Sequence, residues 1–282
     1  MARSKTIKLF LMDGEPTGRI KCSLANWTGI AYKIPKRDLD KFKDIKWLQQ
    51  SGVYFLFGTD EKYNQAVYVG QAGARKNGKG LLLRIQEPHN SIDYWTEAVM
   101  FTTTNNSFGS TEISYLENRF CNMALEADRY KVKNGNEPNP SNITEETKSE
   151  LEEFIDYAKI VMGTLGHKVF EPLISQSSET EDTEPLFYMD YKKCKAFGKR
   201  TTDGFVILKG STINPPIAKS CPENVVKARQ KYADKISDTY ELTADILMTS
   251  PSAAAGFIGG ASLSGNALWH TSDGTTLKQL DS

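Results

Sequence analysis

The chain has 282 residues, of which 39% are hydrophobic and 25% charged, and its 35 basic residues balance its 35 acidic residues. This composition is typical of globular domains, and no apolar run approaches the roughly 20 residues that a membrane span needs. Four cysteines lie far apart without a CxxC pair, which argues against a zinc site or a disulfide framework. We therefore expect a cytoplasmic protein with reduced cysteines.

Residues 1–50 predict three strands followed by a helix. The strand-like pieces are IKLFLM, GRIKCSL and GIAYKI, and the first of them ends at a turn over residues 13–16. A helical stretch is expected from Arg37 to Gln50, because apolar side chains recur there at every third position. These apolar positions are Leu39, Phe42, Ile45 and Leu48.

Residues 51–173 predict an α/β core in which strands and helices alternate. Two apolar runs that each carry a tyrosine are expected to pair as antiparallel strands, with WTEAVMFTT as a further strand. Helices are expected near residues 80–87, 111–127 and 144–162, and Thr144 is placed to cap the last of them. The predicted core is a small, mainly antiparallel three-stranded sheet with flanking helices, which the N-terminal strands extend.

Residues 174–185 predict an acidic linker, because serine, threonine and acidic residues dominate and nothing apolar can pack. A separate small α+β domain is expected over residues 186–282. Its strands are predicted in FYMDY and GKRTTDGFVILKG, and a helix is predicted near residues 222–237.

The two tyrosine runs, SGVYFLFG and QAVYVGQ, are the most informative local feature of the core. Alternate side chains of a strand share one face, so Tyr54 and Tyr68 are expected to face away from the apolar residues beside them. From Lys62 to Arg84 there are five basic residues and no acidic one. This segregation can give a positive face to a chain without net charge.

Five elements in chain order resemble the GIY-YIG nuclease family. The two namesake tripeptides stand as GVY (52–54) and YVG (68–70), and an arginine follows in LLLRIQEPH. A glutamate occurs in SYLENRF on the expected long helix, and KNGNEP supplies an asparagine near the end of the module. NWTG and GHKVFEP resemble extensions found in one subfamily. TDGFVILKGSTI and SPSAAAGFIGG resemble a small C-terminal domain of unknown function that is often appended to such enzymes.

The resemblance implies a metal-dependent endonuclease that hydrolyses phosphodiester bonds in DNA. Glu117 would hold Mg²⁺ or Mn²⁺, because a carboxylate is a hard oxygen ligand that suits these ions. Arg84 would stabilise the scissile phosphate as a permanent, forked cation. Tyr54 would take the proton of the attacking water, and Tyr68 would position phosphate or water.

Further site residues follow from the same resemblance. Asn134 or Asn136 would brace the site, and a histidine would lie near the arginine. That histidine usually falls four positions after the arginine, whereas here Pro88 intervenes and His89 follows at five, so it either turns back to the site or points elsewhere. The implied substrate contacts come from Gly70, Gln71, Arg75, Lys76 and Lys79.

A second hypothesis is a nucleic-acid-binding or regulatory module that retains the fold without cleaving. Gln71 and the displaced His89 favour it, because the family often has a lysine at the first position and its histidine one residue earlier. The C-terminal domain leaves further alternatives open, since it can contact DNA or can be a β-domain that packs on the nuclease or binds protein. The residues that could contact phosphates or stack on unpaired bases are Lys192, Lys193, Lys195, Lys199, Arg200, Tyr188, Tyr191 and Phe197.

Overall fold

A computed structural model describes residues 4–42, 45–61, 63–74, 80–89, 92–136, 138–139, 141–174, 184–219 and 221–282. The chain divides into two compact units, Met1–Pro172 and Leu173–Ser282. Each unit has its own sheet, so the expected mixed α/β class with a separate C-terminal α+β domain is confirmed. Most of the predicted linker lies outside the described residues.

The first unit holds a seven-stranded sheet in the order β1-β2-β3-β6-β4-β5-β7. Its strands are β1 (Ile7–Leu11), β2 (Ile20–Leu24), β3 (Gly29–Pro35), β4 (Gly52–Thr59), β5 (Gln65–Ala72), β6 (Trp95–Thr103) and β7 (Lys131–Val132). Neighbouring strands run antiparallel, except that β7 runs parallel to β5. The predicted three-stranded sheet is β6-β4-β5, and the N-terminal strands extend it through β3.

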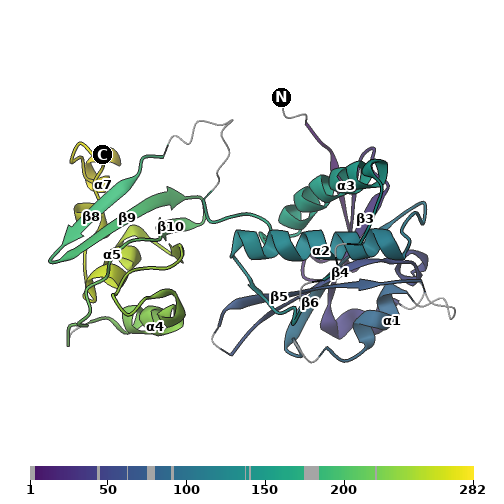
Figure 1. The fold of residues 1–282 in the computed structure, drawn as a ribbon, viewed down its shortest axis with the longest axis horizontal. Helices are drawn as coiled ribbons and strands as arrows, with labels where there is room; N and C mark the ends of the chain where they lie inside the picture. Colours follow the sequence, from purple (N-terminus) through teal and green to yellow (C-terminus); the bar gives the residue numbers. More distant parts are fainter. Residues whose placement is uncertain are drawn as a thin grey trace. The chain divides into compact units, whose positions relative to one another are not determined.

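The two faces of the central strand β4 pack against different helices. Phe55 lies in a core with α2 (Ser110–Ala127) and α3 (Glu145–Thr164). Tyr54 lies in a second core with α1 (Leu81–Gln86). Figure 1 shows α2 and α3 on one side of this sheet and α1 on the other. The alternation expected for the tyrosine strands is therefore confirmed.

The helical stretch expected between Arg37 and Gln50 differs from the prediction. The structure has two 3₁₀-helices there, η1 (Lys36–Phe42) and η2 (Lys46–Gln49), in place of one continuous helical stretch. An apolar residue at every third position matches the three residues per turn of a 3₁₀-helix better than the 3.6 of an α-helix. The buried side chains Phe42 and Leu48 face the same core as Tyr54.

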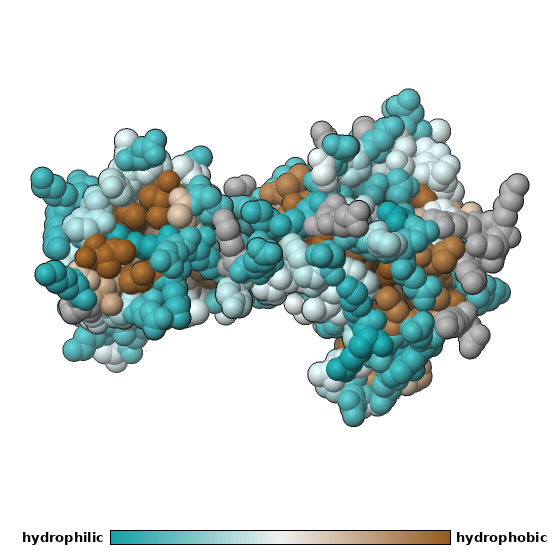
Figure 2. Space-filling model, turned by 90° about the horizontal axis from the view of Figure 1, so that it is seen from below, coloured by the Kyte–Doolittle hydropathy of each residue, from teal (hydrophilic) through white to brown (hydrophobic). Residues whose placement is uncertain are grey.

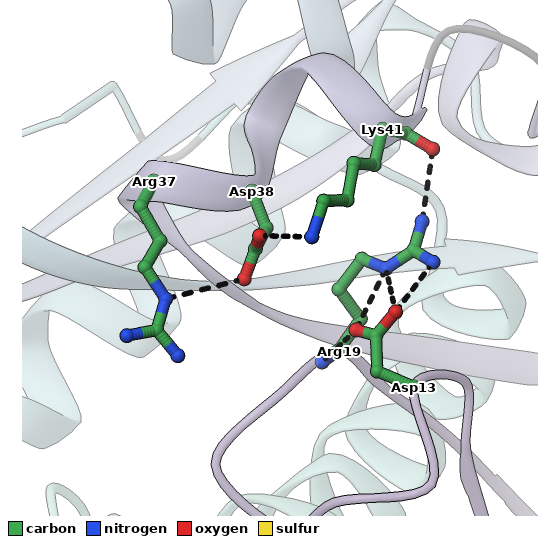
Figure 3. A network of polar contacts seen from close by, with 5 residues as sticks. All are labelled: Asp13, Arg19, Arg37, Asp38 and Lys41. Atoms are coloured by element: carbon green, nitrogen blue, oxygen red, sulfur yellow. Dashed lines mark hydrogen bonds and ion pairs between the residues drawn. The ribbon is translucent and has the colours of Figure 1, made fainter.

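A hydrogen bond from Arg19 connects the β1–β2 turn to η1, and ion pairs lie on both sides of it (Figure 3). The Arg19 guanidinium contacts Asp13 at 2.7 Å and donates to the Lys41 carbonyl at 2.9 Å. On η1, the Asp38 carboxylate pairs with Lys41 at 2.7 Å and with Arg37 at 3.5 Å. Hydrogen bonds from Arg19 hold the pKa of Asp13 well below its usual range.

This network predicts a loss of stability at acidic pH. The Asp13 carboxyl has a lower pKa in the folded than in the unfolded chain, so its contribution is complete above the unfolded pKa of about 3.9 and declines as the pH falls below it. We expect Asp13→Asn to lower the thermal midpoint at neutral pH and to flatten its decline below about pH 4. A matched control is Glu15→Gln in the same turn. Equal acid profiles for Asp13→Asn and the parent would contradict the prediction.

The second unit has a four-stranded sheet in the order β11-β10-β9-β8. The strands are β8 (Phe187–Tyr191), β9 (Cys194–Thr201), β10 (Gly204–Ile207) and β11 (Ile246–Met248). The helices are α4 (Glu223–Lys231), η3 (Ala233–Lys235), α5 (Pro251–Gly259), α6 (Gly265–Leu268) and α7 (Leu277–Leu280). α5 packs on the sheet, where Phe257 and Trp269 are fully buried in one core.

Hydrophilic residues cover much of the face seen in Figure 2, and hydrophobic surface occurs on it as separate patches. Across the described part of the chain, every helix is too short or too polar to cross a membrane. All four cysteines carry free thiols, and Cys22, Cys121 and Cys194 are buried.

Candidate active site

Two tyrosines and a histidine form one aromatic cluster on the α1 side of the first sheet. The rings of Tyr54 and Tyr68 lie 6.2 Å apart, between centroids, on the neighbouring strands β4 and β5. The His89 ring lies 5.7 Å from the Tyr54 ring and 5.8 Å from the Tyr68 ring. The sequence left open whether His89 turns back to the site or points elsewhere, and in the structure it lies beside the tyrosines. The chain reaches this place because α1 ends before Pro88.

The glycine of the second tripeptide makes room for the tyrosine of the first. Gly70 lies directly opposite Tyr54 in the β4–β5 register. A Cβ atom at Gly70 would overlap with Cζ and the hydroxyl oxygen of Tyr54. The Tyr54 ring therefore lies flat over the Gly70 backbone, which only glycine permits.

We expect Gly70→Ala to destabilise the first unit by about 3 kcal/mol, because overpacking of a rigid core typically costs 1–3 kcal/mol. Tyr54 is fully buried, so a shift of its ring would disturb the core around it. The matched control is Gly73→Ala, where a Cβ atom meets nothing within 4 Å. Urea unfolding of both variants measures the difference, and equal midpoints would show that the Tyr54–Gly70 contact is not tight.

Arg84 lies on α1 next to the aromatic cluster. Its guanidinium donates to Glu87 at 2.8 Å, and its backbone carbonyl lies 3.1 Å from Nε2 of His89. The Arg84 charge acts on Tyr54, where it lowers the pKa of the hydroxyl against the larger effect of burial. The arginine thus reaches the tyrosines electrostatically while it is paired to a neighbour on its own helix.

Glu117 comes from the opposite side of the sheet, on α2. Its side chain is half-buried, and its Oε2 accepts a hydrogen bond of 2.9 Å from the Gln71 amide at the end of β5. The residue that stands where the family often has lysine is therefore the partner of the predicted metal ligand. Sequence reasoning missed this pairing, because it depends on how α2 crosses the end of β5.

Burial is the largest cause of the pKa shifts of Tyr54, Glu117 and His89. It raises the pKa of the Tyr54 hydroxyl above its ordinary value, and the neighbouring Tyr68 adds to the shift. Burial also raises the pKa of Glu117, although Gln71 and the Arg84 charge oppose it. The pKa of His89 is lowered, again chiefly by burial. At neutral pH both Tyr54 and His89 are therefore uncharged.

The Tyr54 hydroxyl is buried and has no hydrogen-bond partner of acceptable geometry among the described residues. Such an unpaired group is costly in a folded protein, by about 1–3 kcal/mol. Unpaired buried polar groups occur mainly where a ligand, an ion or water completes the site. Buried polar atoms of Trp27, Gln50 and Tyr94 share this state among the described residues, and the Tyr54 hydroxyl is the one that lies beside Tyr68, His89 and the Arg84 charge.

Asn134 is tied to the second tripeptide by its side chain. Its Oδ1 accepts from the Val69 amide at 3.0 Å, and its Nδ2 donates to the Val69 carbonyl at 2.8 Å. The side chain thereby takes the place of a neighbouring strand beyond β7 and fixes β5 next to Tyr68. Asn136 is exposed. The predicted contacts Arg75, Lys76 and Lys79 lie outside the described residues.

The chemistry of the donor set fits a divalent metal with few protein ligands. Among the described residues, no three histidine, cysteine or acidic side chains come together as a metal site. Mg²⁺ commonly keeps several waters and binds one or two carboxylates together with substrate phosphate. Glu117 meets this requirement as a single carboxylate, since its described partner is the uncharged Gln71 amide.

Residues 187–281 match a family described as a domain of unknown function (DUF4357). The match covers the second unit and does not bear on residues 51–173, so the nuclease resemblance of that part stays a prediction. Neither a curated protein nor a solved structure matches the chain.

Proposed function

We propose that the first unit is a metal-dependent endonuclease that hydrolyses phosphodiester bonds in DNA. The observation that carries the proposal is the buried, unpartnered Tyr54 hydroxyl, which lies among Tyr68, His89 and the charge of Arg84. Glu117 supplies a carboxylate from the far side of β5. The combination of a hydroxyl cluster, one cation and one carboxylate suits an anionic substrate that water must attack.

Each side chain has a role that its surroundings support. Arg84 binds the phosphate oxygens, and phosphate then replaces Glu87 as its partner. Tyr54 accepts the proton of the attacking water once the cationic groups around bound substrate have lowered its pKa. Tyr68 orients phosphate or water through its hydroxyl. Neutral His89 holds the ring cluster and the end of α1 in place.

Mg²⁺ or Mn²⁺ bound at Glu117 would neutralise charge on the phosphoryl group and on the leaving 3′ oxygen. Gln71 holds the carboxylate in position without neutralising it, since an amide donor carries no net charge. Substrate phosphate would complete the site. We also propose a cytoplasmic location, which the four free thiols support.

The deciding experiment is a cleavage assay with single-stranded, duplex and branched DNA and with RNA, in Mg²⁺ and in Mn²⁺. Cleavage that requires the metal supports the proposal. A substrate left uncut under all these conditions, at enzyme in excess, contradicts it.

The second candidate is a nucleic-acid-binding module that does not cleave. The Arg84–Glu87 ion pair favours it. The Arg84 guanidinium is the group expected to bind phosphate, and the Glu87 carboxylate is already paired with it. This candidate predicts salt-dependent binding of the same nucleic acids without any metal-dependent product.

A further inference from the structure

The second unit carries three aromatic rings outside its core. Tyr188 on β8 lies opposite Phe197 on β9, and their ring centroids are 5.8 Å apart in an edge-to-face arrangement. The His270 ring stacks on Tyr188 with centroids 6.3 Å apart and planes inclined by 25°. All three are half-buried, and within the described residues none belongs to the hydrophobic core of the unit.

The three rings lie on the face of the sheet that α5 leaves open. Phe187 and Ala196 point into the core, to which α5 contributes Phe257. Alternate side chains of a strand point to opposite faces, so Tyr188 and Phe197 point away from this core. Figure 1 shows α5 alongside the β8–β10 sheet. The three rings therefore contact one another outside the core that α5 covers, and part of each ring is accessible.

Basic side chains flank the rings on the same face. Lys195 and Lys199 lie two positions before and after Phe197, and Lys195 is exposed. The β8–β9 turn adds two exposed lysines, Lys192 and Lys193. Asp190 is the acidic residue of the two strands; it lies opposite Lys195 in the β8–β9 register, and its carboxylate lies 3.9 Å from His270. The strands and their turn therefore present an excess of positive charge around the rings.

We propose that this β8–β9 face binds single-stranded nucleic acid, with bases stacked on the rings and phosphates held by the lysines. Alternate residues of a strand repeat about every 6.8 Å, so the two lysines stand roughly 14 Å apart with Phe197 between them. Stacking requires base faces that a duplex hides and a single strand exposes. The proposal goes beyond the nuclease function and does not depend on it, since different residues in a different unit carry it.

The test uses the full chain with Glu117→Ala, so that a bound strand stays intact. A fluorescent oligothymidine is titrated with protein between about 50 and 200 mM salt, and its anisotropy gives the affinity. Phe197→Leu keeps an apolar side chain but removes the ring, and we expect about tenfold weaker binding. For Lys195→Gln with Lys199→Gln, we expect weaker binding and a salt slope smaller by about 1.4, since each phosphate contact on single strands contributes about 0.7.

The control is Lys209→Gln with Lys278→Gln, which removes two exposed lysines of the same unit that lie outside β8 and β9. Thermal midpoints equal to that of the parent show that each variant is folded. Cross-links from a bromouracil strand, mapped by mass spectrometry, are expected within residues 187–201. Cross-links found only in residues 51–172, or equal salt slopes for the two lysine pairs, would overturn the proposal. Failure of DNA cleavage by the parent chain would leave these readouts unchanged.

Discussion

Replacing Glu117 by glutamine is expected to reduce metal-dependent DNA cleavage by about a thousandfold, the scale on which a lost transition-state charge contact lowers turnover. Glutamine keeps the length and the hydrogen-bonding oxygen of the side chain, so the contact with Gln71 can persist. Only the negative charge that a divalent cation requires is removed. Cleavage is measured with a labelled DNA substrate over a range of Mg²⁺ concentrations.

The matched control is Glu126→Gln, which removes an exposed carboxylate from the same helix. We expect its cleavage rate and thermal midpoint to equal those of the parent. If Glu117→Gln cleaves as fast as Glu126→Gln, the metal is not held at Glu117 and the site assignment is wrong. A partial loss that saturating Mn²⁺ restores would instead support a weakened metal site.

Tyr54→Phe is expected to change activity and stability in opposite directions. Loss of the hydroxyl removes the group proposed to accept a proton, and such groups contribute about a hundredfold or more to rate. The same change removes a buried oxygen that lacks a partner among the described residues, so the free energy of unfolding should rise by about 1 kcal/mol. DNA cleavage and urea unfolding of the same preparation measure both effects.

Tyr115→Phe provides the opposite control. The Tyr115 hydroxyl donates to Glu152 at 2.6 Å, so its removal leaves a carboxylate with one bond fewer and should lower stability. It lies on α2 with its ring among the residues of the other core, and we expect cleavage to be unchanged. If the Tyr54→Phe variant is less stable than the parent, the Tyr54 hydroxyl of the parent forms a hydrogen bond in solution, and this prediction is wrong.

Local patterns predicted most of the secondary structure. Period-two alternation identified β4 and β5 and assigned their tyrosines to one face, because Val53, Phe55, Val67 and Val69 alternate with them and pack in the α2 and α3 core. The N-cap at Thr144 was also correct, since its hydroxyl accepts from the Thr147 amide at 3.3 Å. Such features depend only on residues that are close in sequence, so they can be predicted from the sequence alone.

Contacts across the fold could not be predicted in the same way. The direction of His89 after Pro88 depends on the position of α1 against β4 and β5, which no local pattern encodes. The choice between Asn134 and Asn136 depends on which side chain meets the open edge of β5. The period of three between residues 37 and 50 predicted a helical stretch, and the structure divides it into two short 3₁₀-helices, whose geometry fits that period.

The amide pairing of Asn134 with Val69 has a consequence for hydrogen exchange. Every second backbone amide of β5 points toward β4, but the Val69 amide points outward and donates to the side chain of Asn134, 65 residues along the chain. Its exchange with deuterium therefore reports the release of one amide side chain and does not require the sheet to open. In Asn134→Ala this one proton should exchange fast while its neighbours on β4 stay protected. The exchange rate of the Val69 amide thus reports a local opening next to Tyr68 separately from global unfolding.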